Sequence, residues 1–206
     1  RVKGLGREDP TVKMLKMVVE KYGWYPCPSF SPFNPYQFEG NKTIAYELAE
    51  QFGWQAPGWV FVPVGSACLF SGVYKGFKEF QELGFIGELP RLAAVQPEGN
   101  QPLVKAFSEG KGPFDIEPWP KPETVATGLA DPYPWDGDMA IRALRETEGI
   151  ALAVSDEEIL KAQELLASRE GIFAEPSGVT GLAGLVKAVE EGLVDRDERI
   201  VILVTG

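Results

Sequence analysis

The sequence predicts an α/β fold: an open, mostly parallel, twisted sheet with helices on both of its faces. Short β-branched runs alternate along the chain with longer segments whose apolar residues recur at helical spacing. Strands joined through helices pair in parallel by right-handed crossovers. With 206 residues, 44% of them hydrophobic, the chain is long enough to bury a substantial core. We therefore expect a single α/β domain over residues 1–206.

The strand-like runs are short, rich in valine, isoleucine and alanine, and bounded by glycine or proline. They predict strands over residues 59–65, 91–97, 150–155 and 199–206. The helical periodicity predicts helices over residues 11–23, 41–53, 71–84, 103–108, 138–149, 156–171 and 177–192.

Two helix starts have capping signals, and one long connection lacks a regular pattern. Asn41 is a candidate N-cap, and Ser155 with Glu158 has the spacing of a capping box. Residues 109–137 are rich in proline, glycine and aromatic side chains, so we expect them to drape over the domain or line a cleft.

Composition narrows the classes of function. The 30 acidic residues outnumber the 20 basic ones, and a net charge of −10 argues against binding to nucleic acid or an anionic membrane. The absence of histidine excludes a Ser-His-Asp triad and the usual zinc ligand sets, so we expect no metal site. Cys27 and Cys68 lie far apart in sequence and are expected to be reduced thiols. Because no run has the length of a membrane span or the pattern of a signal peptide, we expect a cytoplasmic protein.

A further pattern is carried by the closing VILVTG and by four segments, residues 34–54, 57–84, 89–99 and 171–188. In that order they resemble the C-terminal half of threonine synthases, which are pyridoxal-phosphate enzymes of the tryptophan-synthase-β fold type (fold type II). The resemblance implies a part in amino-acid biosynthesis and a lyase that converts O-phosphohomoserine to threonine and phosphate. It also implies pyridoxal phosphate as the cofactor.

The resemblance places the cofactor phosphate in the turn after the strand at 59–65. The family pattern there is approximately V-G-N-G-G-N-L-S-G, and this chain has Gly65, Ser66, Ala67, Cys68 and Leu69 at its centre. Where a glycine of that pattern needs positive φ, a side chain costs roughly 1–2 kcal/mol. The Ala67 and Cys68 side chains would also compete with the phosphate for space. We therefore expect phosphate binding to be weakened or lost.

Two further positions match residues that the family places near the cofactor ring. Glu175 lies in the segment AEPSG, and its alternative role is that of a negative charge at a helix N-terminus. Thr205 stands where the family has a Ser or Thr that hydrogen-bonds the pyridine nitrogen, and its alternative is a frayed chain end.

The substrate loop of the family is matched in part. By resemblance, Asn34, Gln37, Lys42 and Thr43 correspond to residues that bind the substrate phosphate. Gln37 replaces the arginine that would clamp this anion with two hydrogen bonds. Lys42 is either an anion contact or a solvated lysine in the first turn of a helix.

The family's Schiff-base lysine lies in its N-terminal half, and no Ser-Phe-Lys-Asp-like stretch occurs in this chain. We therefore expect no catalytic residue in this chain and no imine from it alone. The chain also begins with Arg1, which indicates an excised or processed piece. We expect it either to self-associate or to pair with a chain that carries the missing half.

Three functions stay open at this point. The chain is part of a threonine-synthase-like enzyme, or a divergent binding or regulatory module without catalysis. The third is a β-replacement or elimination enzyme for another amino acid, once completed by the missing half. A small amino-acid ligand is compatible with all three of them.

Overall fold

The computed structural model of the chain describes residues 10–206, and its centre is a four-stranded parallel sheet. The strand order is β3-β2-β1-β4. Each neighbouring pair runs parallel, which confirms the predicted fold class. The bounds are β1 (Trp59–Pro63), β2 (Arg91–Pro97), β3 (Ile150–Val154) and β4 (Ile200–Ile202).

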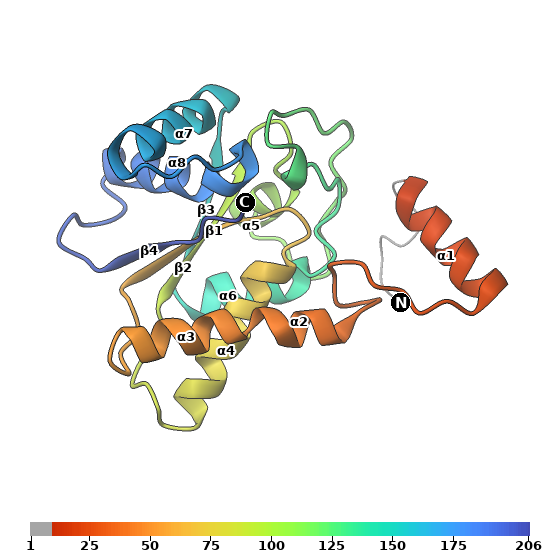
Figure 1. Ribbon diagram of the computed structural model, residues 1–206, viewed down its shortest axis with the longest axis horizontal. Coiled ribbons are helices and arrows are strands. Elements are labelled where there is room, and N and C mark those ends of the chain that lie inside the picture. Colours follow the sequence, from red (N-terminus) through yellow and green to blue (C-terminus); the bar gives the residue numbers. More distant parts are fainter. Residues whose placement is uncertain (1–9) are drawn as a thin grey trace.

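Helices cover both faces of this sheet (Figure 1). On one face lie α3 (Thr43–Gln51), α4 (Cys68–Glu82), α5 (Pro102–Ser108) and α6 (Gly137–Glu146). On the other lie α7 (Asp156–Glu170) and α8 (Pro176–Glu190). Two short helices complete this part of the chain: α2 (Pro35–Asn41) and the 3-10 helix η1 (Thr127–Leu129). Helix α1 (Pro10–Tyr22) lies apart from the sheet.

The two cores follow from the alternation of side chains along a strand. In β1, Val60 and Val62 pack into the core beneath α3, α4 and α6, whereas Trp59 and Phe61 pack beneath α7 and α8. All five β1 residues are buried. A near-continuous apolar run of this kind is typical of a parallel strand covered on both faces.

Most predicted elements are confirmed with shifts of a few residues at their ends, and three of the differences bear on the site. The Ser155–Glu158 capping box is present at the start of α7. Asn41 is the last residue of α2 rather than an N-cap, because Pro35 starts an additional helix before it. Helix α4 begins at Cys68 rather than Ser71, since the amide of Ser71 already donates to the Ala67 carbonyl. Strand β4 pairs only over 200–202, and the amide of Leu203 adds one last bond to Phe61.

The strand order reverses between β1 and β4. The chain moves outward from β1 to β2 and β3 through helices on one face, then returns by α7 and α8 to place β4 on the other side of β1. In open α/β sheets ligands bind beyond the carboxyl ends of the strands at such a reversal. The turn after β1 and the residues after β4 both lie there. Of the helices within residues 10–206, none is long and apolar enough to cross a membrane.

Candidate phosphate turn and its surroundings

The turn between β1 and α4, residues 65–69, has the geometry of an anion-binding helix start. Ala67 adopts left-handed backbone angles, φ 69° and ψ 4°, and the 15-residue helix α4 begins at the next residue. Within the described residues, no side chain caps the N-terminus of α4. The first N–H groups of a helix have no partner inside the helix, and the helix dipole adds positive potential there.

Backbone strain in the turn is confined to one of the two positions that the sequence singled out. Ala67 bears it, while Cys68 is the first residue of a right-handed helix and does not. Both side chains are buried, with 3% of each exposed. The Ala67 methyl packs into the core that includes α4.

The Cys68 thiol is also held inside the protein. Its sulfur accepts a hydrogen bond from Asn41 Nδ2 at 3.3 Å and forms another with the Asp136 carboxylate. Burial, reinforced by the negative charge of Asp136, raises the pKa of Cys68 to about 12. The thiol is therefore protonated and engaged with polar groups inside the protein.

The loop around η1 lies directly against the turn. A methyl group on Gly65 would approach the Gly128 carbonyl oxygen to 3.2 Å and Asp131 Oδ2 to 3.1 Å. Asn100 holds this loop in place, because its side-chain amide donates to the carbonyls of Leu129, at 2.7 Å, and Asp131, at 2.8 Å. Residues 126–131 thus form one wall beside the turn, as the sequence predicted for part of segment 109–137.

Glu175 and Thr205 are brought to the same edge of the sheet. The Glu175 amide donates to the Gly206 carbonyl at 3.1 Å, and Glu175 Oε1 would lie 3.7 Å from a methyl group on Gly128. Gly128 in turn donates its N–H to Ser177 Oγ at 3.0 Å. Glu175 precedes α8 without capping it by its side chain, and both Glu175 and Thr205 are exposed.

The residues matched to a substrate loop separate into different environments. Asn34 is buried and donates to the Pro28 carbonyl at 3.4 Å, whereas Gln37 on α2 is exposed. Thr43 is exposed, and its hydroxyl donates to the Gly40 carbonyl at 2.8 Å.

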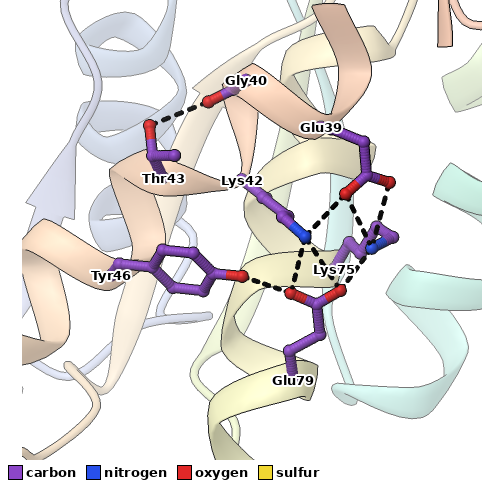
Figure 2. A network of polar contacts seen from close by, with 7 residues as sticks. All are labelled: Glu39, Gly40, Lys42, Thr43, Tyr46, Lys75 and Glu79. Carbon is purple, nitrogen blue, oxygen red and sulfur yellow. Dashed lines mark hydrogen bonds and ion pairs between the residues drawn. The ribbon is translucent and has the colours of Figure 1, made fainter. Parts of the chain in front are cut away.

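Lys42 belongs to a network of charges between the α2–α3 junction and α4 (Figure 2). Its amine contacts Glu39 at 2.6 Å and Glu79 at 3.0 Å, and Lys75 pairs with the same two carboxylates. The Tyr46 hydroxyl also donates to Glu79. Hydrogen bonds to Glu39 and Glu79 raise the pKa of Lys42 despite its partial burial.

The place of this network along α4 separates it from the turn. Glu79 lies eleven positions after Cys68, which is about 16 Å along a helix axis. The amine of Lys42 is therefore directed to the C-terminal part of α4 and away from its N-terminus. Of the two carboxylates that hold Lys42, Glu39 lies three residues before it, whereas Glu79 lies 37 residues away in sequence and has no local signal.

Sequence reasoning missed several residues that shape the turn. Asn100 and Ser177 support its neighbouring loop, and Asp136 contacts the turn itself. An Asp before a helix is ordinarily interpreted as an N-cap, so Asp136 carries no distinct signal in the sequence. In the described part of the chain, no group of three or more acidic or cysteine side chains is arranged to hold a metal ion.

Comparison with known proteins gives this geometry a family. The family model described as pyridoxal-phosphate dependent enzyme matches residues 2–206. Threonine synthase from Methanocaldococcus jannaschii is 45% identical over 201 residues, which are 98% of this chain and 48% of that protein. Threonine synthase from Methanosarcina acetivorans is 44% identical over 173 residues, which are 84% of this chain and 42% of that protein.

Solved structures show the same fold. The processed form of threonine deaminase isoform 2 from Solanum lycopersicum superposes with a TM-score of 0.75 at 23% identity, over 93% of this chain and 51% of that one. The chain spans about half the length of the curated relatives it matches. Both the family match and the identity to threonine synthases show that the chain belongs to the pyridoxal-phosphate dependent enzymes.

Proposed function

We propose that the chain is a portion of a threonine-synthase-like enzyme, and that residues 65–69 receive the phosphate of pyridoxal phosphate. The observation that carries the proposal is the uncapped N-terminus of α4 at the point where the strand order reverses. Helix N-termini of this kind bind phosphate through backbone N–H groups and the helix dipole. Because backbone groups make this cradle, it tolerates changes of side chain better than a site built from side chains.

The residues present fit the cofactor. Ala67 keeps the left-handed turn that a glycine would adopt freely, and the Ala67 and Cys68 side chains are packed within the protein. Pyridoxal phosphate supplies an electron-withdrawing ring that stabilises negative charge on a substrate carbon. In our proposal the turn anchors its phosphate, while Glu175 and Thr205 lie toward the ring. Thr205 offers a neutral hydroxyl to the ring nitrogen, which favours elimination and replacement.

The lysine that forms the imine comes, in this proposal, from outside residues 42–206. A lysine that forms an imine needs a neutral amine, which a carboxylate partner opposes. All eight lysines of this range pair with acidic groups: Lys42, Lys75, Lys78, Lys105, Lys111, Lys121, Lys161 and Lys187.

A second candidate function uses the same cofactor but a different substrate. Gln37 stands in place of an anion-clamping arginine, and it is exposed rather than tied into the fold. This favours an enzyme of the same chemistry that acts on an amino acid without a phosphate group. A module that binds a ligand without catalysis is the third candidate, and the acidic pairing of every lysine in residues 42–206 is the observation in its favour.

The binding test compares pyridoxal phosphate with pyridoxal, which differ in the phosphate group alone. We expect pyridoxal phosphate to bind this chain at least about tenfold more tightly, the effect of one or two hydrogen bonds to a charged group. Ser66→Asp should abolish this preference by repulsion, yet leave stability unchanged or higher, because a carboxylate is favourable at a helix N-terminus. Ser66→Asn is the neutral control of similar size. Equal affinities for the two aldehydes, or an unaffected Ser66→Asp variant, would contradict the proposal.

The choice among the three functions needs the missing half. With a lysine-bearing N-terminal portion added, the first candidate predicts phosphate release from O-phosphohomoserine. The second predicts turnover of an unphosphorylated amino acid instead. The third predicts ligand binding with no turnover of either.

A further inference from the structure

Asp136 occupies the N-cap position of α6 but does not cap that helix with its side chain. An Asp at this position ordinarily accepts a bond from its own helix, worth about 1 kcal/mol. Here the carboxylate is turned elsewhere, and 3% of the residue is exposed. Because this buried carboxylate accepts no hydrogen bond from its own helix, it needs donors from other parts of the chain.

The backbone of Asp136 fixes the phosphate turn. Its N–H donates to the Ser66 carbonyl at 2.9 Å, and its carbonyl accepts from Ser71 Oγ at 3.1 Å. In a planar trans peptide the carbonyl and the following N–H point in opposite directions. With the Ser66 carbonyl held toward Asp136, the N–H of Ala67 is directed away from it. Asp136 thereby sets the orientation of one donor of the proposed phosphate cradle.

The carboxylate of Asp136 fixes a second segment, residues 28–34. It accepts from the Ser31 backbone N–H, at 3.2 Å to Oδ2, and from the Ser31 hydroxyl. The neighbouring Trp135 ring stacks on Phe30, with ring centres 5.2 Å apart. This segment contains Asn34 and leads directly into α2, which carries Gln37, and both residues were matched to a substrate loop.

The same carboxylate also bonds the Cys68 thiol, so three separate parts of the chain meet at one side chain. Burial raises the pKa of Asp136, while the two hydrogen bonds from Ser31 oppose that rise. The charged and titratable groups near it are Cys68 and Asp138. No cation neutralises the carboxylate in these contacts, so hydrogen bonds from Ser31 and Cys68 are what stabilise its charged form.

We propose that Asp136 is a positioning residue that links the seating of segment 28–34 to phosphate binding at residues 65–69. The inference rests on the function proposed above. A phosphate that fixes the turn also fixes the Ser66 carbonyl and Cys68, and through them the Asp136 carboxylate that Ser31 binds. Such a linkage is reciprocal. If bound phosphate favours the packed position of residues 28–34 by some factor, packing of these residues raises the affinity for phosphate by the same factor.

The linkage is measured by amide hydrogen exchange of residues 28–34 in the full chain, with pyridoxal phosphate, pyridoxal or neither. Pyridoxal phosphate should slow exchange in this segment, whereas pyridoxal should not. Asp136→Asn keeps the backbone bonds to the turn and weakens the carboxylate contacts, so it should remove this protection. A role confined to folding stability would not distinguish the two ligands.

Ser31→Ala is the second variant, since it removes one donor to the Asp136 carboxylate and leaves the other, the Ser31 backbone N–H, in place. We expect it to lower the affinity for pyridoxal phosphate about tenfold, the effect of one hydrogen bond to a charged group. Its effect should be much smaller when Asp136→Asn is already present. Ser108→Ala is the matched control, because that exposed hydroxyl donates only to the Lys105 carbonyl at 2.9 Å.

The two proposals fail in different ways. No preference for pyridoxal phosphate over pyridoxal in the unaltered chain would overturn both. A clear preference, with unchanged exchange in residues 28–34 and an unaffected Ser31→Ala variant, would overturn the linkage alone.

Discussion

Two regions that the sequence matched to binding motifs have opposite electrostatic character. The elbow, Glu39–Tyr46 packed on Lys75 and Glu79, satisfies its charges internally. The phosphate turn, residues 65–69, has a helix N-terminus without a capping side chain. A charged side chain in a motif is therefore weaker evidence for a ligand than unsatisfied polar groups. On this criterion the turn is equipped for an anion, and Lys42 serves the fold.

The largest loss of stability should come from a substitution at Gly76, where α4 packs against the elbow. A methyl group on Gly76 would lie 2.3 Å from the Lys42 carbonyl oxygen and 2.8 Å from Ala45 Cβ. Gly76→Ala should therefore lower the free energy of unfolding by at least about 2 kcal/mol, measured by chemical denaturation. Gly40→Ala is the control within the same elbow, because its methyl group has no neighbour within 4 Å. Equal stability of Gly76→Ala and the unaltered chain would show that the helices do not pack this closely.

The next test separates the two side chains of the turn. Cys68→Gly deprives Asn41 and Asp136 of a buried partner, so we expect a loss of about 2 kcal/mol in stability. Ala67→Gly removes about 1–2 kcal/mol of left-handed strain. The greater freedom of glycine in the unfolded chain offsets about 0.4–1 kcal/mol of this, which leaves a small gain. Thermal unfolding of both variants measures the difference, and effects of the same sign would contradict the assignment of strain to Ala67 alone.

The smallest effect concerns the pH dependence of the elbow. Partial burial would raise the pKa of Glu79, but hydrogen bonds from Lys75, Tyr46 and Lys42 outweigh it and lower this pKa to about 2. A lowered pKa means that Glu79 contributes stability above the unfolded value of 4.5 and loses it as the pH falls toward 2. Glu79→Gln should cost about 1 kcal/mol at pH 7, as expected for a partly exposed ion network. Denaturation curves from pH 7 to 2 should show the two proteins converge, and a constant difference would rule out this linkage.

Local patterns predicted the elements of the fold well. The bounds of β2 are those expected, and the spacing of Ser155 and Glu158 identified a capping box, because periodicity and capping are encoded within a few residues. The site was less predictable. One of the two partners of Lys42, Glu79, lies far along the chain, and the Asp136 side chain binds Ser31 although its position in the sequence is that of an N-cap. The sequence predicted strain at Ala67 only for the case that this position has positive φ. Whether it does could not be predicted, because φ is set by the surrounding packing.

The most direct test of the central claim is to saturate the chain with pyridoxal phosphate, reduce it with borohydride and map the labelled lysines by mass spectrometry. We claim that this chain supplies the phosphate site and that the imine lysine lies outside residues 42–206. The expected result is phosphate-dependent binding without stoichiometric labelling of any lysine in residues 42–206. Full labelling of one lysine in that range would contradict the claim.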